Sequence, residues 1–358
     1  MSLIIISLKD VVNLNRFNQT FTDSNFKQYM KTAIITGITG QDGAYLSKFL
    51  LEKDYKVIGI TRNLQSGNSN GLSFLGVEND VELVEANVFD LSNIIRLLEK
   101  FKPDEFYNLA AQSSVGLSFE QPIGTLEYNI ISVANILEAI RIVDKKIKIY
   151  QSSSSEMYGN VAKEKLPIDE EFIIHPASPY AISKAAAHWT CVNYREAYNL
   201  FISSGILFNH ESVLRRQNFV TKKIISSALK IKRNELDSLK VGNTSVQRDW
   251  GYAPEYIKVM WKMLNVPKPN DYIICTGEAY TLQEFIDKVF IKLGLDPEEF
   301  VKFDKALYRP VELEVIYGNP KRAKTELDWN YNLSFDELIE KLIEDEIKYQ
   351  EWWMSKTR

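Results

Sequence analysis

The fold of this chain is decided by the stretch Thr36-Gly37-Ile38-Thr39-Gly40-Gln41-Asp42-Gly43. An apolar run at residues 32–36 precedes it, and an amphipathic stretch at 42–52 follows it. Glycines at this spacing allow a tight turn, close approach of the backbone to a pyrophosphate, and close packing of a helix on a strand. Glycines often do no more than make a turn, but the strand–turn–helix context favours a dinucleotide-binding site.

An alternation of short apolar runs and amphipathic stretches extends outward from this turn. Runs of strand length lie at 32–36, 56–60, 82–86, 104–109, 146–150 and 202–207, and amphipathic stretches include 42–52, 91–101, 125–143 and 180–198. Short, almost wholly apolar strands suit a parallel sheet that helices cover on both faces. We therefore expect an α/β protein with a Rossmann-like, doubly wound parallel sheet. After residue 210 the alternation breaks, which predicts a smaller, mixed α/β domain at the C-terminal end.

These patterns divide the chain into three parts. Residues 1–29 are polar and show no period, so we interpret them as an extension outside the fold. Residues 30–208, joined by 245–268, are expected to form the nucleotide-binding domain. Residues 209–244 and 269–358 are expected to form the second domain.

Composition excludes several classes of protein. The 358 residues are 45% hydrophobic and 25% charged, which is ordinary for a globular protein, and no apolar run approaches the length of a membrane helix. The net charge of −4 argues against a nucleic-acid partner. Two distant cysteines and three histidines without ligand spacing argue against a disulfide framework or a metal site. We expect a cytoplasmic location, because few cysteines are typical of a reducing compartment.

The residue that ends the second predicted strand bears on the choice of cofactor. An acidic residue at this place usually binds the ribose 2′-hydroxyl of NAD, whereas an arginine can pair with the 2′-phosphate of NADP. The strand ends in Arg62, which favours NADP over NAD. A solvated surface arginine is the alternative interpretation.

A tyrosine and a lysine lie four residues apart at the start of the helix at 180–198. Residues at this spacing share a helix face, so the Lys184 ammonium can favour the ionised form of Tyr180, which would otherwise be a weak base. Upstream, Ser154 and Glu156 follow the fifth predicted strand, where a ligand crevice is expected. A surface pair of tyrosine and lysine, and a turn of small polar residues with an exposed glutamate, are the alternative interpretations.

These stretches resemble the extended short-chain dehydrogenase/reductase family and, within it, the GDP-mannose 4,6-dehydratases. The resemblance runs from residue 31 to residue 349. It rests on motifs at 35–43, 107–113, 155–159, 205–212, 218–221, 248–251 and 308–310. The Gln41-Asp42-Gly43 form of the turn and the stretch Asn209-His210-Glu211-Ser212 separate this branch from ordinary sugar epimerases.

The resemblance implies a mechanism. Tyr180 would take the proton from O4 of the sugar while the C4 hydride passes to NADP, with Lys184 holding the phenolate ionised. Ser154, where the family has threonine, would hydrogen-bond O4, and Glu156 would remove the C5 proton. Water would leave from C6 and the hydride would return there. A hydro-lyase of this kind converts GDP-mannose, or a close GDP-manno-sugar, to GDP-4-keto-6-deoxy-mannose.

The resemblance also implies binding residues and partners. Those for NADP are Gly37, Ile38, Thr39, Gly40, Gln41, Asp42, Arg62, Asn87, Val88, Leu109, Ala110, Ala111, Gln112, Ser113, Tyr180, Lys184, His210 and Arg215. Those for the GDP-sugar are Ser113, Asn209, Lys223, Arg248, Arg309 and Glu312, where two arginines suit a diphosphate. A homodimer or homotetramer is implied. A nucleotide-sugar 4-epimerase or reductase, and a non-catalytic NADP-binding protein, remain alternatives.

The chain departs from the family pattern around the cofactor and the sugar. Asn87 stands where an aspartate contacts adenine, and Asn63 stands where a second arginine serves cofactor and subunit contacts. Other replacements are Ser114 for histidine, Gly124 for a cofactor-contacting tyrosine, and Val213-Leu214 for Pro-Arg. These departures leave open the exact sugar and the oligomeric state.

Overall fold

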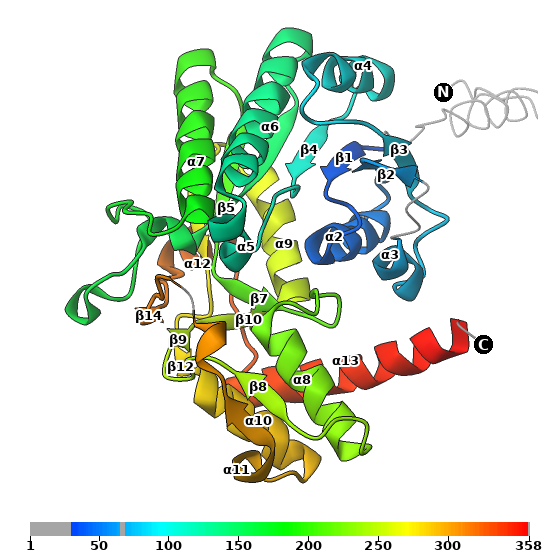
Figure 1. Ribbon diagram of the computed structural model, residues 1–358. Helices are drawn as coiled ribbons and strands as arrows, with labels where there is room; N and C mark the ends of the chain where they lie inside the picture. Colours follow the sequence, from blue (N-terminus) through cyan, green and yellow to red (C-terminus); the bar gives the residue numbers. More distant parts are fainter. Residues whose placement is uncertain (1–29, 65–68, 309, 357–358) are drawn as a thin grey trace, which may run out of the picture.

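The computed structural model describes residues 30–64, 69–308 and 310–356 (Figure 1). The predicted extension at 1–29 and the predicted ligand residue Arg309 lie outside these ranges.

A seven-stranded sheet forms the centre of the larger lobe, in the order β11-β6-β5-β4-β1-β2-β3. All neighbouring strands are parallel. The strands are β1 (Thr32–Thr36), β2 (Lys56–Thr61), β3 (Glu82–Glu85), β4 (Glu105–Asn108), β5 (Lys148–Ser154), β6 (Ile202–Leu207) and β11 (Asp271–Ile274). The predicted doubly wound α/β fold is confirmed, because helices cover both faces of this sheet.

Two apolar cores hold the helices on the sheet. On one face, α4 (Leu91–Phe101), α6 (Pro122–Val143) and α7 (Pro179–Tyr198) pack on strand residues such as Phe106 and Ile149. On the other, α2 (Gln41–Leu51), α9 (Ala253–Leu264) and α12 (Lys321–Leu327) pack around Tyr107 and Tyr150. Each large side chain buried in these cores contributes about 1.5–3 kcal/mol.

Helix α4 illustrates how the local sequence sets these elements. The side chain of Asp90 caps its first turn by accepting from the backbone nitrogens of Ser92 and Asn93. Ile94, Leu97 and Leu98 are spaced so that one helix face meets the sheet.

The second lobe has its own core, formed by α8 (Val220–Lys232), α10 (Leu282–Leu293) and α13 (Phe335–Lys356). Helix α13 then returns to the larger lobe, where the rings of Tyr349 and Trp352 lie 5.0 and 5.5 Å from that of Phe74 in α3 (Asn70–Phe74). Figure 1 shows this helix reaching across from the second lobe. The remaining elements are short: α5 (Val115–Glu120), β7 (Asn209–Glu211), β8 (Leu239–Val241), β9 (Gln247–Arg248), β10 (Trp250–Tyr252), β12 (Tyr280–Thr281), α11 (Pro297–Phe300), β13 (Val301–Phe303), β14 (Val315–Ile316) and the 3-10 turns η2 (Ser155–Tyr158), η3 (Lys163–Lys165) and η4 (Lys305–Leu307).

Two features differ from the expectation. Residues 271–274 were expected in the second domain, but β11 is the edge strand of the central sheet, paired with β6. The carboxylate of Glu170 accepts a hydrogen bond from the backbone nitrogen of Ile273 at 2.9 Å, which satisfies part of that open edge. The fifth strand also runs further than predicted, because pairing with β6 continues to Ser154 and Leu207.

Three further findings concern the described residues alone. No helix among them is both long and apolar enough to cross a lipid bilayer. They contain no cluster of three or more histidine, cysteine or acidic side chains arranged to hold a metal ion. Cys191 and Cys275 are buried free thiols.

Candidate active site

The carboxyl ends of the parallel strands open into a cavity of about 1110 Å³. Residues at the ends of β1, β2, β4, β5 and β6 form one side, and α8 with residues 240–248 forms the other. A pocket for one drug-sized ligand holds about 300–1,000 Å³. The cavity therefore exceeds the usual room for a single small ligand, at the place where open α/β sheets bind nucleotides.

The glycine-rich turn at the end of β1 forms one wall of this cavity. Gly37 has a φ of +69°, and a Cβ built there would lie 3.0 Å from the backbone nitrogen of Ala110. Thr36 Oγ1 accepts from the backbone nitrogens of Leu109 and Ala110, both at 3.1 Å, so the turn is tied to the end of β4. Among the described residues no side chain caps the N-terminus of α2, whose N-cap is Gly40. Its first backbone N–H groups therefore suit an anion.

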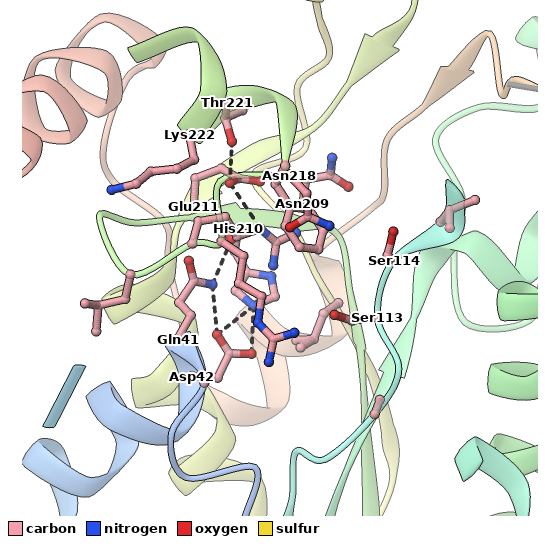
Figure 2. A pocket seen from close by; sticks show the side chains of 18 of the residues that line it. Gln41, Asp42, Ser113, Ser114, Asn209, His210, Glu211, Asn218, Thr221 and Lys222 are labelled. Atoms are coloured by element: carbon pink, nitrogen blue, oxygen red, sulfur yellow. Dashed lines mark hydrogen bonds and ion pairs between the residues drawn. The ribbon is translucent and has the colours of Figure 1, made fainter. Parts of the chain in front are cut away.

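A buried ion pair joins this turn to β7 (Figure 2). His210 Nε2 lies 3.0 Å from the Asp42 carboxylate, and its Nδ1 lies 2.9 Å from the carbonyl oxygen of Phe208. Both ring nitrogens face acceptors, an arrangement that favours the doubly protonated, positively charged ring. Burial opposes the charge on each partner, but their mutual attraction raises the pKa of His210 and lowers that of Asp42 to about 2. The Tyr256 ring stacks on the imidazole at 4.9 Å.

The predicted catalytic residues meet at the ends of β5 and α7. Ser154, Glu156, Tyr180 and Lys184 all line the cavity. The Ser154 hydroxyl hydrogen-bonds Tyr180, and the charge of Glu156 acts on the same phenol. Lys184 Nζ lies 5.9 Å from the centre of the Tyr180 ring and donates to the carbonyl oxygen of Ser152 at 2.8 Å. A hydroxyl, a carboxylate, a phenol and an amine thus converge on one region.

Burial shifts both members of the Tyr–Lys pair toward their neutral forms. It raises the pKa of Tyr180 to about 12, partly offset by the hydrogen bond from Ser154 and reinforced by the charge of Glu156. It lowers the pKa of Lys184 to about 8, against the opposing attraction of Asp42. Both shifts disfavour the ionised phenol, so the ionisation of Tyr180 by Lys184 stays a prediction.

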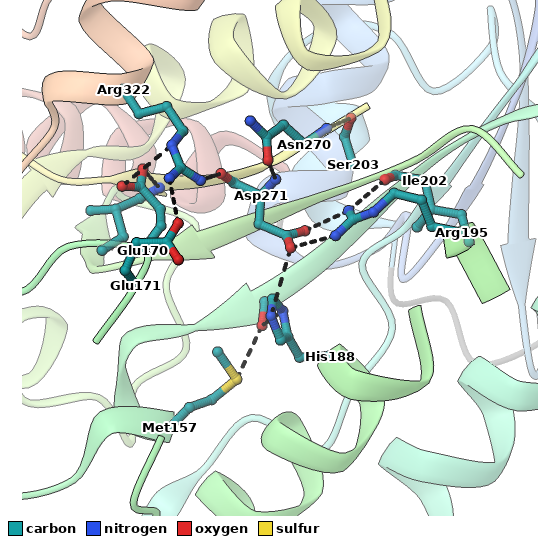
Figure 3. Close-up of polar contacts among 12 residues, drawn as sticks. Met157, Glu170, Glu171, His188, Arg195, Ile202, Ser203, Asn270, Asp271 and Arg322 are labelled. Carbon is teal, nitrogen blue, oxygen red and sulfur yellow. Dashed lines mark hydrogen bonds and ion pairs between the residues drawn. The ribbon is translucent and has the colours of Figure 1, made fainter. Parts of the chain in front are cut away.

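A buried polar network supports the strand that carries Ser154 (Figure 3). Arg195 donates to both carboxylate oxygens of Asp271, at 2.8 and 2.7 Å. His188 Nε2 lies 3.8 Å from that carboxylate, and its Nδ1 lies 3.4 Å from the hydroxyl of Ser153. Burial lowers the pKa of His188. The network connects α7 and β11 to the end of β5.

Basic side chains from the second lobe face the same cavity. Arg248 is 6% exposed, donates to the carbonyl oxygen of Leu313 at 2.7 Å, and pairs with Glu312 at 3.1 Å. Arg215 lies 3.4 Å from the carboxylate of Glu211. Lys223 Nζ donates to a backbone carbonyl oxygen of β8 at 2.7 Å. This wall combines three cations with two carboxylates, which fixes the cations in place.

Most predicted site residues line the cavity, and three described ones do not. Ile38 is fully buried in the core below the turn, and Asn87 is exposed and bonds the backbone nitrogen of Phe89 at 3.0 Å. Gln112 donates to Ser114 and to a threonine of α6, both at 3.0 Å. Ile38 thus packs in the core, whereas Asn87 and Gln112 hydrogen-bond the backbone of nearby residues. Those that do line the cavity are Gly37, Thr39, Gly40, Gln41, Asp42, Arg62, Val88, Leu109, Ala110, Ala111, Ser113, Ser154, Glu156, Tyr180, Lys184, Asn209, His210, Arg215, Lys223, Arg248 and Glu312.

The cavity also has lining residues that the sequence did not indicate. Tyr128 lies on α6 near Arg62, Lys240 lies in β8, and Asn243 follows that strand. Helical periodicity offers a signal for Tyr128, because it lies one turn after the buried Thr125. Residues 240–243 carry no such pattern, since β8 has only three residues.

Comparison with known proteins gives consistent matches. The family profile described as GDP-mannose 4,6 dehydratase matches residues 34–342. GDP-mannose 4,6 dehydratase 1 of Arabidopsis thaliana is 42% identical over 336 residues, covering 91% of this chain and 92% of its own length. The Homo sapiens GDP-mannose 4,6 dehydratase is 36% identical, covering 91% and 94%. A crystal structure of dTDP-glucose 4,6-dehydratase from Bacillus anthracis, in complex with NAD, has a TM-score of 0.79 at 20% identity and covers 91% and 99%.

Proposed function

The chain belongs to the GDP-mannose 4,6-dehydratase family, and from this premise we propose its reaction. It is a hydro-lyase that converts GDP-mannose, or a close GDP-manno-sugar, to GDP-4-keto-6-deoxy-mannose with NADP as cofactor. The observation that carries the proposal is the position of Glu156, which lines the same cavity as Ser154, Tyr180 and Lys184 and acts electrostatically on Tyr180. A dehydratase needs a separate base beside the Tyr–Lys pair, and this carboxylate supplies one.

The residues around the glycine turn fit a dinucleotide. A Cβ at Gly43 would lie 2.4 Å from the carbonyl oxygen of Gly37, so only glycine keeps this turn close enough for a pyrophosphate. The N-terminus of α2, which no side chain caps among the described residues, favours negative charge at the same place. Arg62 also lines this cavity. It supports NADP as the cofactor, because its guanidinium can pair with a 2′-phosphate.

When bound, oxidised NADP would supply the hydride acceptor and a positive charge that lowers the pKa of a nearby phenol. Tyr180 would then release its proton and accept the one from O4 of the sugar, while Ser154 hydrogen-bonds the same oxygen. Lys184, held by the carbonyl oxygen of Ser152, would keep positive charge beside the phenolate. Once C4 is a ketone the C5 proton is acidic, and Glu156 would remove it. Hydroxide leaving C6 would take up that proton, so one water would be lost. The hydride would then return to C6 and C5 would take up a proton, which balances the proton removed from O4 and leaves the cofactor oxidised.

The second lobe fits the diphosphate and its sugar. Arg215, Lys223 and Arg248 line the wall opposite the sheet. Arg248 is buried and held by Glu312, so its guanidinium is fixed in direction. We propose that Lys223 and Arg248 bind the GDP diphosphate, whereas Arg215 contacts NADP. Asn209 and Glu312, which line the same cavity, would bond sugar hydroxyls.

Mass spectrometry tests the reaction directly. The protein is incubated with NADP and a panel of GDP-hexoses and GDP-heptoses, and the product is expected to be 18 Da lighter than one of them, because one water is lost. Deuterium from solvent should appear at C5, since Glu156 exchanges that proton. A product of unchanged mass with inverted C4 would instead indicate a 4-epimerase. No change in any sugar would refute the proposal.

The variant Glu156→Gln tests the base. It should still reduce bound cofactor in the presence of substrate, because Tyr180 and Lys184 remain, but lose turnover by roughly 10²–10⁴-fold. Glu164→Gln, an exposed change in η3, is the matched control and should leave turnover unchanged. Full turnover of Glu156→Gln would show that another group removes the C5 proton.

We also propose that the chain forms a homodimer or homotetramer. Helices α6 and α7 pack side by side and leave large apolar side chains exposed, among them Ile131 at 45% and Trp189 at 56%. Exposed apolar surface of this kind favours association with a second copy. Light scattering after size-exclusion chromatography should give at least twice 41.3 kDa, and a monomer at working concentrations would refute this part.

A further inference from the structure

Tyr128 occupies the end of the cavity where Arg62 lies. It is a half-buried residue of α6 whose side chain lines the cavity, and the Arg62 guanidinium carbon lies 5.6 Å from the centre of its ring. Arg62 itself is exposed and, among the described residues, forms no ion pair. Burial raises the pKa of Tyr128, and the nearby charge of Arg62 opposes part of that rise. The two side chains therefore interact through the ring.

The Tyr128 ring also contacts a second aromatic side chain. The ring of Phe89 lies 5.4 Å from that of Tyr128 at an interplanar angle of 42°. The segment that carries Phe89 is fixed to α6, because Asn135 donates to the carbonyl oxygens of Val88 and Phe89 at 3.2 and 2.8 Å. Asn135 lies two helical turns after Tyr128, on the same side of α6. Tyr128 is thus an ordered platform, whereas Arg62 alone would be a flexible surface side chain.

We infer that Tyr128 is a specificity-determining residue for the cofactor: its ring holds the Arg62 guanidinium where a 2′-phosphate binds. This inference rests on the proposed use of NADP. An arginine on an aromatic face loses less conformational freedom when it binds a phosphate, because it is already confined. Removing the ring should therefore weaken the binding of NADP, which carries the 2′-phosphate. The binding of NAD, which lacks that phosphate, should stay unchanged.

Equilibrium binding of NADP⁺ and NAD⁺ to the full-length protein tests the inference without reference to turnover. Isothermal titration calorimetry of Tyr128→Leu should show NADP⁺ binding about three- to fivefold weaker, which corresponds to about 0.7–1 kcal/mol, with NAD⁺ binding unchanged. Tyr128→Phe keeps the ring and is the matched control, so it should bind both cofactors within about twofold of the parent.

A double-mutant cycle with Arg62→Gln identifies the partner. The inference predicts that Tyr128→Leu has no further effect on NADP⁺ once Arg62 is Gln, because the ring then has no guanidinium to hold. Equal weakening of NAD⁺ and NADP⁺ by Tyr128→Leu would overturn the inference, since the ring would then contact the adenosine that both share. So would weakening by Arg62→Gln but not by Tyr128→Leu. If Arg62→Gln leaves the preference for NADP⁺ intact, the role given to Arg62 and Tyr128 fails while the proposed use of NADP stands. A parent protein that binds NAD⁺ as tightly as NADP⁺ would refute the proposed cofactor itself.

Discussion

The ion pair between the glycine turn and β7 makes a quantitative prediction for Asp42→Asn. This change keeps the size and shape of the side chain and removes its charge. His210 would then be a buried imidazole with no counter-charge near Nε2. Because burial is the largest influence on the pKa of His210, that pKa should fall below its ordinary value of 6.5 in the variant, whereas it lies above 6.5 in the parent.

The size of the effect follows from the pKa of Asp42. A fall in pKa from 3.8 to about 2 corresponds to about 2.4 kcal/mol, because one pKa unit is worth about 1.36 kcal/mol. The Asp42 side chain is 18% exposed, so solvent screens the pair little. Asp42→Asn should therefore lower the free energy of unfolding by about 2 kcal/mol near pH 6.

The pH dependence has a definite sign. The folded pKa of Asp42 is depressed, so its contribution is complete above pH 3.8 and is lost as pH falls through about 2. The folded pKa of His210 is raised, so its contribution is complete below pH 6.5 and is lost as pH rises through the folded value. The difference between parent and variant should be largest between pH 4 and 6.5 and smaller at pH 9.

Two measurements check this prediction. Urea unfolding followed by tryptophan fluorescence at pH 5.5 and 9 gives the stability difference, with the exposed Asp237→Asn as control. Proton NMR of the ring C–H signals gives the pKa of His210, because the chain has only three histidines. The reasoning is refuted if His210 titrates near 6.5 in the parent, or if the two aspartate variants are equally stable at pH 5.5.

Two further substitutions test the packing of the turn and the buried pair that fixes α8 to α13. A Cβ at Gly43 would lie 2.4 Å from the carbonyl oxygen of Gly37, so Gly43→Ala should cost about 3 kcal/mol and abolish NADP binding, as measured by thermal unfolding and calorimetry. A Cβ at Gly124 would meet no described atom within 4 Å, so Gly124→Ala should leave binding unchanged and add up to about 1 kcal/mol; similar stability of the two variants would contradict the steric argument. Lys222 forms a buried ion pair with Glu346, so Lys222→Met should cost about 3–5 kcal/mol by stranding the carboxylate, and adding Glu346→Gln should restore part of it in urea unfolding. If Lys222→Met alone is as stable as the parent, the pair contributes nothing to the free energy of unfolding.

The fold was predictable from the sequence because its signals are local. The turn at 36–43 and the period of the apolar runs require neighbours only a few residues away, and β1 and β2 are paired as such runs imply. The edge strand β11 was not predictable in the same way. Its partner β6 ends at Leu207, which is 64 residues before β11 begins at Asp271. The elements between the two strands belong to the other lobe or to α9. A strand of four residues, mostly apolar, does not indicate which distant strand it pairs with.

The site was predictable where residue type and spacing alone decide the chemistry, and less so where packing decides. Gln112 stands in a recognisable motif, yet its side-chain amide donates to Ser114 and to a threonine of α6. These hydrogen bonds tie the loop after β4 to α6. Gly124 stands where the resemblance expects a tyrosine, and the structure has a tyrosine one helical turn later, at Tyr128. A motif compared position by position misses such a displacement, whereas a helix surface tolerates it, because residues four apart share a face.

The protonation of the Tyr–Lys pair shows most clearly what spacing leaves undecided. An i, i+4 spacing brings Lys184 to Tyr180, and the 5.9 Å from Nζ to the ring centre agrees with it. Proximity alone would lower the pKa of the phenol, but both groups are buried, and burial penalises each charged form. With a pKa of about 12 for Tyr180 and about 8 for Lys184, the pair at neutral pH is a neutral phenol beside an ammonium close to losing its proton. The phenol becomes a base only when further positive charge enters the cavity, so we expect the cofactor to bind before the sugar can react.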